Sequence, residues 1–427
     1  MKFSLYNMVS EIDDGLIIVN TKNSKYVKLN KQPDVEHFIT LYNGDLALNK
    51  SDEMVNSLYK QGYIVDDEIN EYLTVKENID EFYAPYKKTL QMILYITMQC
   101  NFRCVYCPEK HYDKHFSDDL WQSIYLHIEK GINDGVYNTI NLTFFGGEPL
   151  LEIDRMLLFL EKLDKLSKRF PSVKFIHEIV TNGYLLTPDI YDKLVNYNVL
   201  LYQITIDGFA ETHNKLRHLI GGQGTWDKII DNLKYINNKK DKAKISLRAN
   251  YNDSNADTME KYRQWELETF DNPKFEFKYV PVTELSEFVP HNVIINESST
   301  LDTAIREDLN NGFKMLKPCS HVCNATYPNF YTISVDGKIA ICENISSEAK
   351  ELYIGYIDEL GNLILNNYED WTENFEIEAC KECLCYPVCA ARTCPAKKAL
   401  FKETRPDCRI VQNHFQNEVL HFIQNKL

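Results

Sequence analysis

Residues 97–107 read TMQCNFRCVYC, so Cys100, Cys104 and Cys107 lie on one short segment in the pattern C-x3-C-x2-C. Three thiolates so close together can hold three irons of a 4Fe-4S cluster and leave the fourth iron without a protein ligand. An open iron can bind a substrate or cofactor, whereas a cluster that only carries electrons is normally ligated at every iron. The alternatives are a zinc knot or a chance grouping of cysteines.

This spacing, with the aromatic Tyr106 just before the last cysteine, resembles the signature of the radical S-adenosylmethionine (SAM) enzymes. The resemblance implies that the open iron chelates the amino and carboxylate groups of SAM. It also implies that one electron cleaves SAM to a 5'-deoxyadenosyl radical, and that Tyr106 packs near the adenine. The alternative for Tyr106 is simple core packing.

Composition limits the class of protein. A chain of 427 residues with 44% hydrophobic and 26% charged residues is typical of a soluble globular protein with two or three domains. No apolar run reaches the roughly 20 residues of a membrane span, so we expect a cytoplasmic location and no membrane partner. Twelve cysteines in such a chain indicate metal or redox chemistry. The net charge of -15 argues against a nucleic-acid partner.

Between residues 91 and 281 short segments rich in β-branched and aromatic residues alternate with helical patterns. The predicted strands are residues 91–97, 139–145, 173–181, 200–207, 244–251 and 274–281. Helical patterns begin after Ser117, a candidate N-cap, and cover residues 156–166 and 225–236. Six β/α units predict a parallel α/β fold, as an open sheet or a barrel. The radical SAM resemblance implies a partial (β/α)6 barrel whose cluster loop follows the first strand.

Candidate SAM contacts follow in the order that the resemblance implies. Gly146, Gly147 and Glu148 end the second predicted strand and resemble the GGE motif, whose backbone and carboxylate bind the SAM amino group. Two glycines permit close backbone approach to a ligand, and a carboxylate suits an ammonium. The later segments that look like SAM contacts contribute Thr181, Asn182, Thr205 and Arg217. Their alternative is a structural role as turns and a surface arginine.

Nine cysteines lie between residues 319 and 408 and resemble the SPASM extension of radical SAM enzymes that modify peptides and proteins. That extension binds two auxiliary 4Fe-4S clusters, which makes three clusters in all. The resemblance assigns Cys319, Cys323, Cys342 and Cys394 to the first auxiliary cluster, and Cys380, Cys383, Cys389 and Cys408 to the second. Four residues instead of the usual three separate Cys389 from Cys394, and the first auxiliary cluster could have an open iron.

Two further residues in this region are candidates for function. Cys385 remains outside the eight assigned ligands, and is either a small buried hydrophobe or the hydrogen-atom donor of a peptide epimerase. Glu343 follows Cys342, where the sulfatase maturases carry an acidic base, and so is a candidate proton acceptor. The alternative for Glu343 is an ordinary charged residue beside a ligand. Gly337 is expected to form a tight hairpin between strands 330–335 and 338–341.

The first residues predict a small winged-helix-like α+β module. Strands are expected at residues 4–11, 16–20 and 25–29, helices near 35–41 and 54–59, and residues 62–65 close the unit before an acidic stretch at 66–71. The module resembles the RiPP recognition element, which binds the leader of a ribosomally made precursor peptide by adding it as a strand. The alternative is a scaffold or dimerisation module.

These parts predict three domains: a leader-recognition module at 1–85, a radical SAM domain at 86–310 and a SPASM domain at 311–427. The resemblance implies a peptide maturase that abstracts a hydrogen and forms a thioether crosslink, with an external one-electron reductant of the flavodoxin or ferredoxin type. A carbon-carbon crosslink, formylglycine formation by an anaerobic sulfatase maturase, peptide epimerisation and a non-catalytic iron-sulfur regulator are the alternatives.

Overall fold

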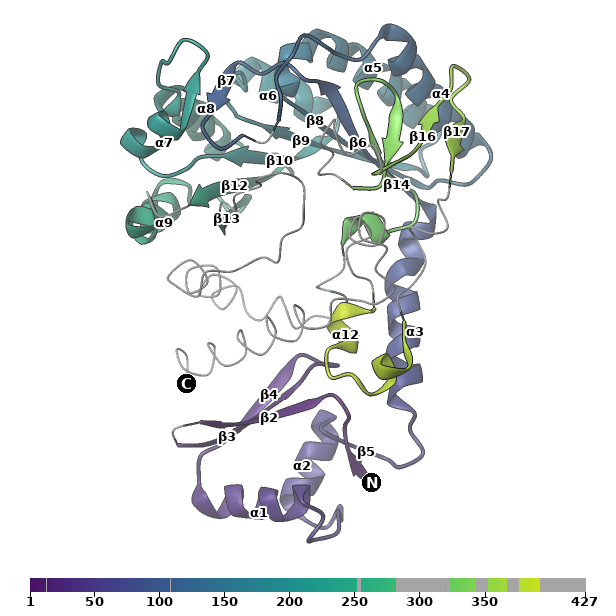
Figure 1. Ribbon diagram of the computed structural model, residues 1–427, viewed down its shortest axis with the longest axis vertical. Coiled ribbons are helices and arrows are strands. Elements are labelled where there is room, and N and C mark those ends of the chain that lie inside the picture. Colours follow the sequence, from purple (N-terminus) through teal and green to yellow (C-terminus); the bar gives the residue numbers. More distant parts are fainter. Residues whose placement is uncertain are drawn as a thin grey trace.

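The computed structural model describes residues 1–12, 14–107, 109–251, 255–281, 319, 323–342, 352–366 and 376–391. Figure 1 shows a large sheet with helices on one face at the top, a small N-terminal module at the bottom, and the helix α3 (Glu71–Tyr83) between them. No helix in the described ranges is long and apolar enough to cross a membrane.

Six parallel strands form the centre of the large sheet. They are β6 (Thr89–Thr97), β8 (Thr139–Gly146), β9 (Lys174–Thr181), β10 (Val199–Thr205), β12 (Lys244–Tyr251) and β13 (Phe275–Pro281), in the order β13-β12-β10-β9-β8-β6. Each agrees with a predicted strand, which confirms the parallel α/β fold. Each bound lies within about two residues of the predicted one, the usual uncertainty of such limits.

The cysteine-rich part of the chain extends this sheet. Strand β14 (Phe330–Ile333) pairs in parallel with the free edge of β6, and β15 (Lys338–Ala340) returns antiparallel to it. The turn between them contains Gly337 at φ 75°, which confirms the expected hairpin. Strands β16 (Tyr353–Ile357) and β17 (Leu363–Leu365) complete the ten-stranded sheet.

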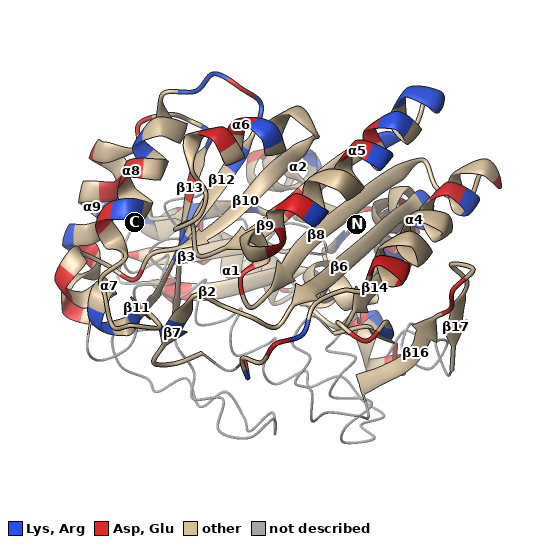
Figure 2. Cartoon of the chain, turned by 90° about the horizontal axis from the view of Figure 1, so that it is seen from above, with Lys and Arg blue, Asp and Glu red and all other residues tan. Residues whose placement is uncertain are grey.

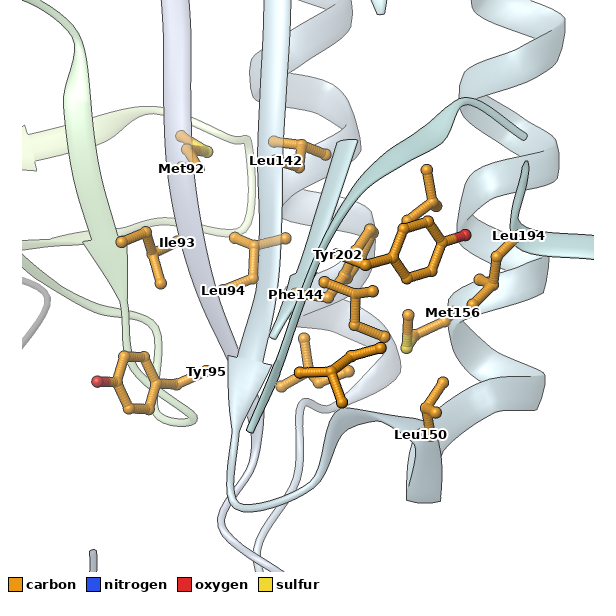
Figure 3. Packing of buried hydrophobic residues seen from close by; sticks show 14 of the residues in the cluster. Met92, Ile93, Leu94, Tyr95, Leu142, Phe144, Leu150, Met156, Leu194 and Tyr202 are labelled. Atoms are coloured by element: carbon orange, nitrogen blue, oxygen red, sulfur yellow. The ribbon is translucent and has the colours of Figure 1, made fainter. Parts of the chain in front are cut away.

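Helices cover one face of the sheet. They are α4 (Asp118–Asn133), α5 (Ile153–Arg169), α6 (Pro188–Asn196), α8 (Trp226–Asn237) and α9 (Met259–Thr269). Figure 3 shows Leu142 and Phe144 packed between the strands and helix residues such as Met156, whereas Ile93 and Tyr95 point from β6 to the other face. Figure 2 shows the charged residues concentrated on these outer helices, as expected for amphipathic helices with one buried face.

The N-terminal module has strands followed by helices, as predicted. Strands β2 (Asn7–Ile12), β3 (Gly15–Asn20) and β4 (Lys25–Leu29) form an antiparallel sheet, followed by α1 (Gln32–Tyr42) and α2 (Glu53–Gln61). The closing segment is β5 (Ile64–Val65), which pairs with β1 (Lys2–Phe3).

The single strand predicted at residues 4–11 was wrong in its first part. The buried carboxylate of Glu71 accepts hydrogen bonds from Ser4 Oγ and from the backbone N–H of Leu5, both at 2.8 Å. These bonds hold the chain between β1 and β2 away from strand pairing. Glu71, the last residue of the predicted acidic stretch, is therefore a buried residue that fixes the backbone near Ser4 and Leu5.

Helix α3 was not predicted, although Asn70 caps its first turn by accepting from the N–H of Leu73. Its buried face contacts the cysteine-rich segment: Val75 and Ile79 share a core with Cys319 and Cys380. The helix therefore connects the N-terminal module to the C-terminal cysteines directly, beside α12 (Tyr386–Cys389) as Figure 1 shows.

Strand β3 buries both of its faces. Leu16 and Ile18 pack in the core of the module, whereas Ile17 and Val19 pack on the other side against Cys385 and Val388. A hydrogen bond of 2.7 Å from Thr21 Oγ1 to the carbonyl of Leu384 supports this contact. The N-terminal module and the cysteine-rich segment therefore share one interface core.

Replacing Ile17 by Ala is expected to lower the free energy of unfolding by about 2–5 kcal/mol, because the side chain is fully buried and its loss leaves a cavity. Ile39→Ala on the exposed face of α1 is the matched control and should change it by no more than about 0.5 kcal/mol. Urea unfolding of both full-length variants measures this. Equal losses would contradict the shared core.

Glu266 on α9 should make stability depend on pH. Burial raises the pKa of this carboxyl, which accepts a hydrogen bond from Tyr279, to about 8. The folded chain thus keeps a proton that the unfolded chain loses near its ordinary pKa of 4.5. Stability should fall as pH rises through this window, by at most about 1.4 kcal/mol per unit. Glu266→Gln mimics the protonated acid, so unfolding series at pH 5 and pH 8 should show a smaller fall than in wild type.

Candidate functional site

The three cysteines Cys100, Cys104 and Cys107 lie at the carboxyl end of the parallel strands, in the loop after β6. The short strand β7 (Phe102–Cys104) within this loop pairs antiparallel with β11 (Arg217–Leu219), which places Cys104 opposite Arg217. Backbone bonds of 3.0 Å from Val105 to Leu216 and from Ile220 to Asn101 continue the pairing. The loop is thus held as a strand against a distant part of the chain.

Burial raises the pKa of all three thiols in this loop, that of Cys100 to about 12. At Cys104 the positive charge of Arg217 opposes the effect. A thiol with a raised pKa keeps its proton at neutral pH unless a metal replaces it. Three partly buried thiols with raised pKa values are poor free nucleophiles, and their role as cluster ligands stays a prediction.

The two glycines after β8 lie against the cluster loop. A Cβ on Gly146, whose φ is 128°, would lie 2.1 Å from the carbonyl oxygen of Thr97, and one on Gly147 would lie 2.2 Å from that of Gln99. Backbone bonds of 2.9 Å from Gly147 to Thr97 and 2.8 Å from Glu148 to Gln99 join the two segments. The sequence suggested that these glycines leave room for a ligand; in the structure they leave room for the residues just before Cys100.

Glu148 is fully buried where the end of β8 meets the residues before Cys100. Its carboxylate accepts hydrogen bonds from the N–H of Leu150 at 3.0 Å, from Thr181 Oγ1 at 2.6 Å and from the N–H of Asn182 at 2.8 Å. Burial raises the pKa of Glu148, and these donors and Arg217 oppose the rise. A carboxylate offers about four acceptor positions, so one further donor can be accommodated. Contact with the SAM amino group stays a prediction.

Asn182 also contacts the cluster loop, since its Nδ2 donates to Asn101 Oδ1 at 2.8 Å. Thr205 ends β10 and is the register partner of Arg248 on β12. Thr181 and Asn182 therefore lie with Glu148 at the strand ends. Thr205 lies at the end of the next strand, and its predicted contact with SAM is not tested by the geometry.

Tyr106 and Arg217 are brought together around the buried carboxylate of Asp207, which lies in the segment after the fourth predicted strand but was not singled out as a SAM contact. The Tyr106 hydroxyl donates to Asp207, and accepts from Arg217 Nη1 at 2.8 Å and from Asn250 Nδ2 at 3.1 Å. The N–H of Asn250 donates to Asp207 at 2.9 Å. Position after a strand was the only sequence signal for Asp207, and Asn250 gave no signal within β12.

Only 8% of Arg217 is accessible to solvent, so it is not the surface arginine that was the alternative to a SAM contact. Burial lowers the pKa of the guanidinium, but Tyr106, Cys104 and Asp207 more than offset this, so it stays charged. Its Nε is buried without a hydrogen-bond partner among the described residues. A buried cation with an unused donor beside Cys104 fits an anionic group such as the carboxylate of SAM.

The described C-terminal cysteines lie in two places. Cys319 and Cys380 are buried in the core shared with α3, and the N–H of Cys319 donates to the carbonyl of Pro387 at 2.9 Å. Cys342 lies after β15 and packs against the central core instead. Cys394, Cys408 and Glu343 lie outside the described residues. The division into two auxiliary clusters, including the roles of Cys323, Cys383 and Cys389, stays a prediction.

Cys385 is 3% exposed and packs against Ile17, Val19 and Val388. The prediction of a small buried residue is therefore confirmed. Its place between the N-terminal sheet and α12 also separates it from the cluster loop in the fold, as Figure 1 shows for these elements.

Comparison with known proteins agrees with this geometry. Residues 94–261 match the model of the Radical SAM superfamily. A cysteine-type anaerobic sulfatase-maturating enzyme of Clostridium novyi is 24% identical over 369 residues, which cover 78% of this chain and 96% of that one. The radical SAM cyclopropyl synthase TigE of Paramaledivibacter caminithermalis is 27% identical over 45% of this chain and 44% of its own.

The fold is also that of a solved relative. The structure of native anSMEcpe with bound AdoMet and Kp18Cys peptide has a TM-score of 0.58 and 18% identity, over 79% of this chain and 98% of that one. Residues 94–261 therefore form a radical SAM domain, of a superfamily that uses SAM and a 4Fe-4S cluster.

Gly147→Ala should reduce iron loading, because its new methyl group would meet the carbonyl of Gln99 and displace the residues before Cys100. Gly135→Ala is the control: its φ of 69° brings some strain, but its Cβ would meet open space. We expect the iron bound per chain after anaerobic reconstitution to fall only in the first variant. Normal iron content in Gly147→Ala would show that the cysteine loop still binds iron when the residues before Cys100 are displaced.

Proposed function

We propose that this radical SAM enzyme modifies a ribosomally synthesised precursor peptide, which it binds by the leader, and that it forms a thioether between a cysteine sulfur and a carbon of another residue. The observation that carries the proposal is the N-terminal module, which has an outer strand, β4, paired on one side alone among the described residues, and which shares a core with the cysteine-rich segment.

The proposed docking edge is β4, one of the two outer strands in the order β2-β3-β4, which among the described residues pairs with β3 alone. An edge strand presents backbone N–H and C=O groups that a peptide can pair with. Val27 and Leu29 turn towards the core that includes α1, whereas Lys25 and Tyr26 are exposed. An extended leader added here would lie between the strand edge and α1, and the lysine favours an acidic leader.

The face of the large sheet opposite the helices carries polar side chains that a peptide substrate could contact. Glu178 on β9 accepts a hydrogen bond from Thr143 Oγ1 at 3.1 Å. Burial raises the pKa of Glu178, while Thr143 and the charge of Lys278 on β13 oppose the rise. These three side chains come from the six-stranded part of the sheet, on the face opposite the helices.

The cofactor supplies a carbon-centred radical that can take a hydrogen atom from an unactivated carbon. For a thioether, the thiol gives up its proton, the sulfur bonds to the carbon radical, and one electron leaves to an acceptor. The auxiliary clusters are the proposed acceptor, and Glu343 is the proposed base. The chain's own task is to hold SAM beside Cys100, Cys104 and Cys107 and to exclude water.

Formylglycine formation is the second candidate, favoured by the alignment that covers 96% of a cysteine-type sulfatase-maturating enzyme. About a fifth of this chain has no counterpart in the solved relative. The proposed leader-recognition module at residues 1–85 is a part that formylglycine formation on a sulfatase does not require. The module therefore favours a leader-bearing peptide.

The test is mass spectrometry of iron-loaded protein with SAM, dithionite and synthetic peptides encoded beside its gene. We expect 5'-deoxyadenosine together with a peptide mass loss of about two hydrogens per event, since a crosslink is an oxidation. Formylglycine from cysteine would instead lower the mass by about 18 Da. Unchanged mass with solvent deuterium would indicate epimerisation.

Two variants complete this test. Cys385→Ala should keep crosslinking, because Cys385 is buried among apolar side chains between β3 and α12. Loss of turnover with deuterium uptake in the wild type would support an epimerase. The triple variant Cys100→Ala, Cys104→Ala, Cys107→Ala should form no 5'-deoxyadenosine. Nucleoside formation by the triple variant would contradict the radical SAM site itself.

A further inference from the structure

Behind Arg217 lies a chain of buried hydrogen bonds that includes two residues with no assigned role. The N–H of Asp207 donates to Nδ1 of His213 at 3.2 Å. Nε2 of His213 lies 3.0 Å from Thr225 Oγ1, and Thr225 Oγ1 lies 2.6 Å from the carbonyl oxygen of Arg217. His213, at 0%, and Thr225, at 1%, are inaccessible to water.

The direction of every bond in this chain can be assigned. Because Nδ1 of His213 accepts from a backbone N–H, the ring proton is on Nε2, which donates to Thr225 Oγ1. The Thr225 hydroxyl therefore points its own hydrogen at the Arg217 carbonyl. Burial and the nearby charge of Arg217 lower the pKa of His213, so the ring is neutral, as this pattern requires.

The chain closes into a ring through the site described above. Arg217 Nη1 donates to the Tyr106 hydroxyl, which in turn donates to Asp207. Two hydrogen-bonded paths thus connect Arg217 to Asp207. One runs from the guanidinium through Tyr106, and the other runs from the carbonyl through Thr225 and His213. Both halves of the ring begin at Asp207, which follows β10.

Arg217 needs this support because it stands at the junction of two short elements. It is the C-cap of α7 (Ala210–Leu216) and the first residue of the three-residue strand β11. Neither element is long enough to fix a buried side chain by its own regular hydrogen bonds. Fixing the carbonyl of Arg217 fixes the point from which its side chain starts.

We infer that His213 and Thr225 are positioning residues for the radical-generating site: they hold Arg217 so that its unused donor meets the anionic group of SAM. This inference rests on the proposed SAM contact of Arg217. It adds that a buried, uncharged histidine and a hydroxyl, neither in contact with SAM, determine how tightly SAM binds.

The Thr225 hydroxyl can be removed with little other damage. The N–H groups of Thr225 and Trp226 both donate to Asn214 Oδ1, at 2.8 and 3.0 Å, so the backbone before α8 is held independently. Thr225→Val keeps the shape and removes the hydroxyl, whereas Thr225→Ser keeps the hydroxyl. His213→Asn is a second variant, which keeps an acceptor for the N–H of Asp207 but is too short to reach Thr225.

The experiment measures SAM affinity by equilibrium dialysis on iron-loaded, full-length protein. It also records the EPR spectrum of the reduced cluster with and without SAM. We expect Thr225→Val and His213→Asn to weaken SAM binding about tenfold and to diminish the spectral change caused by SAM, because a displaced donor loses a charge-assisted hydrogen bond. Thr225→Ser should stay within about twofold of wild type.

Tyr191→Phe controls for a general loss of stability. Tyr191 is fully buried and its hydroxyl donates to Asp241 at 3.0 Å, just before β12, at the opposite end of the strands from the cysteines. This variant should lower the melting temperature but leave SAM affinity unchanged. If Thr225→Val behaves in the same way, the ring is merely structural and the inference fails.

Arg217→Ala separates this inference from the proposed function. If Arg217→Ala leaves SAM affinity unchanged, the proposed contact is wrong and the positioning role falls with it. If Arg217→Ala abolishes SAM binding while Thr225→Val and His213→Asn bind normally, the contact stands and only the positioning role is refuted.

Discussion

Two backbone hydrogen bonds, from Gly147 to Thr97 and from Glu148 to Gln99, are the constraint on which the site depends. They join the end of β8 to the last residues before Cys100. A side chain on Gly146 or Gly147 would collide with the backbone of those residues, so both positions require glycine. With the corner closed, Glu148 is buried and collects donors from Leu150, Thr181 and Asn182. The direction in which the cysteine loop leaves the sheet follows from this contact.

Charge around the loop is arranged in two buried units. Glu148 is balanced by neutral donors, whereas Asp207 shares Tyr106 with the cation of Arg217. Since burial opposes ionisation of all three thiols, metal binding must release their protons. Arg217 opposes this cost at Cys104, the cysteine opposite to it across the strand pair. The same arginine is the proposed partner of the SAM carboxylate.

The pattern of apolar residues and the positions of capping and turn residues were sufficient to predict the six parallel strands, the helix N-cap at Ser117 and the hairpin at Gly337. Each of these features is determined by local residue types. Residues that act only through tertiary contact were missed. His213 and Asn250 were not singled out, and their contacts with Asp207 form only when β10, α7 and β12 are in place. Helix α3 had a cap and a periodic apolar face, but its partners lie some 300 residues away. Glycines 146 and 147 were expected to permit close approach to a ligand; in the structure they approach the backbone of Thr97 and Gln99, and approach to a ligand stays a prediction.

The burial of β3 on both faces has a consequence for how the chain is divided. A domain boundary near residue 85 does not separate two independent cores, because Ile17 and Val19 belong to a core completed by Cys385 and Val388. The four consecutive apolar residues from Leu16 to Val19 are typical of a strand covered on both sides. If this module were grafted onto another enzyme as a portable peptide-binding cassette, it would carry an uncovered apolar stripe. The cysteine-rich segment covers this stripe, so a transplanted module would have to keep both parts.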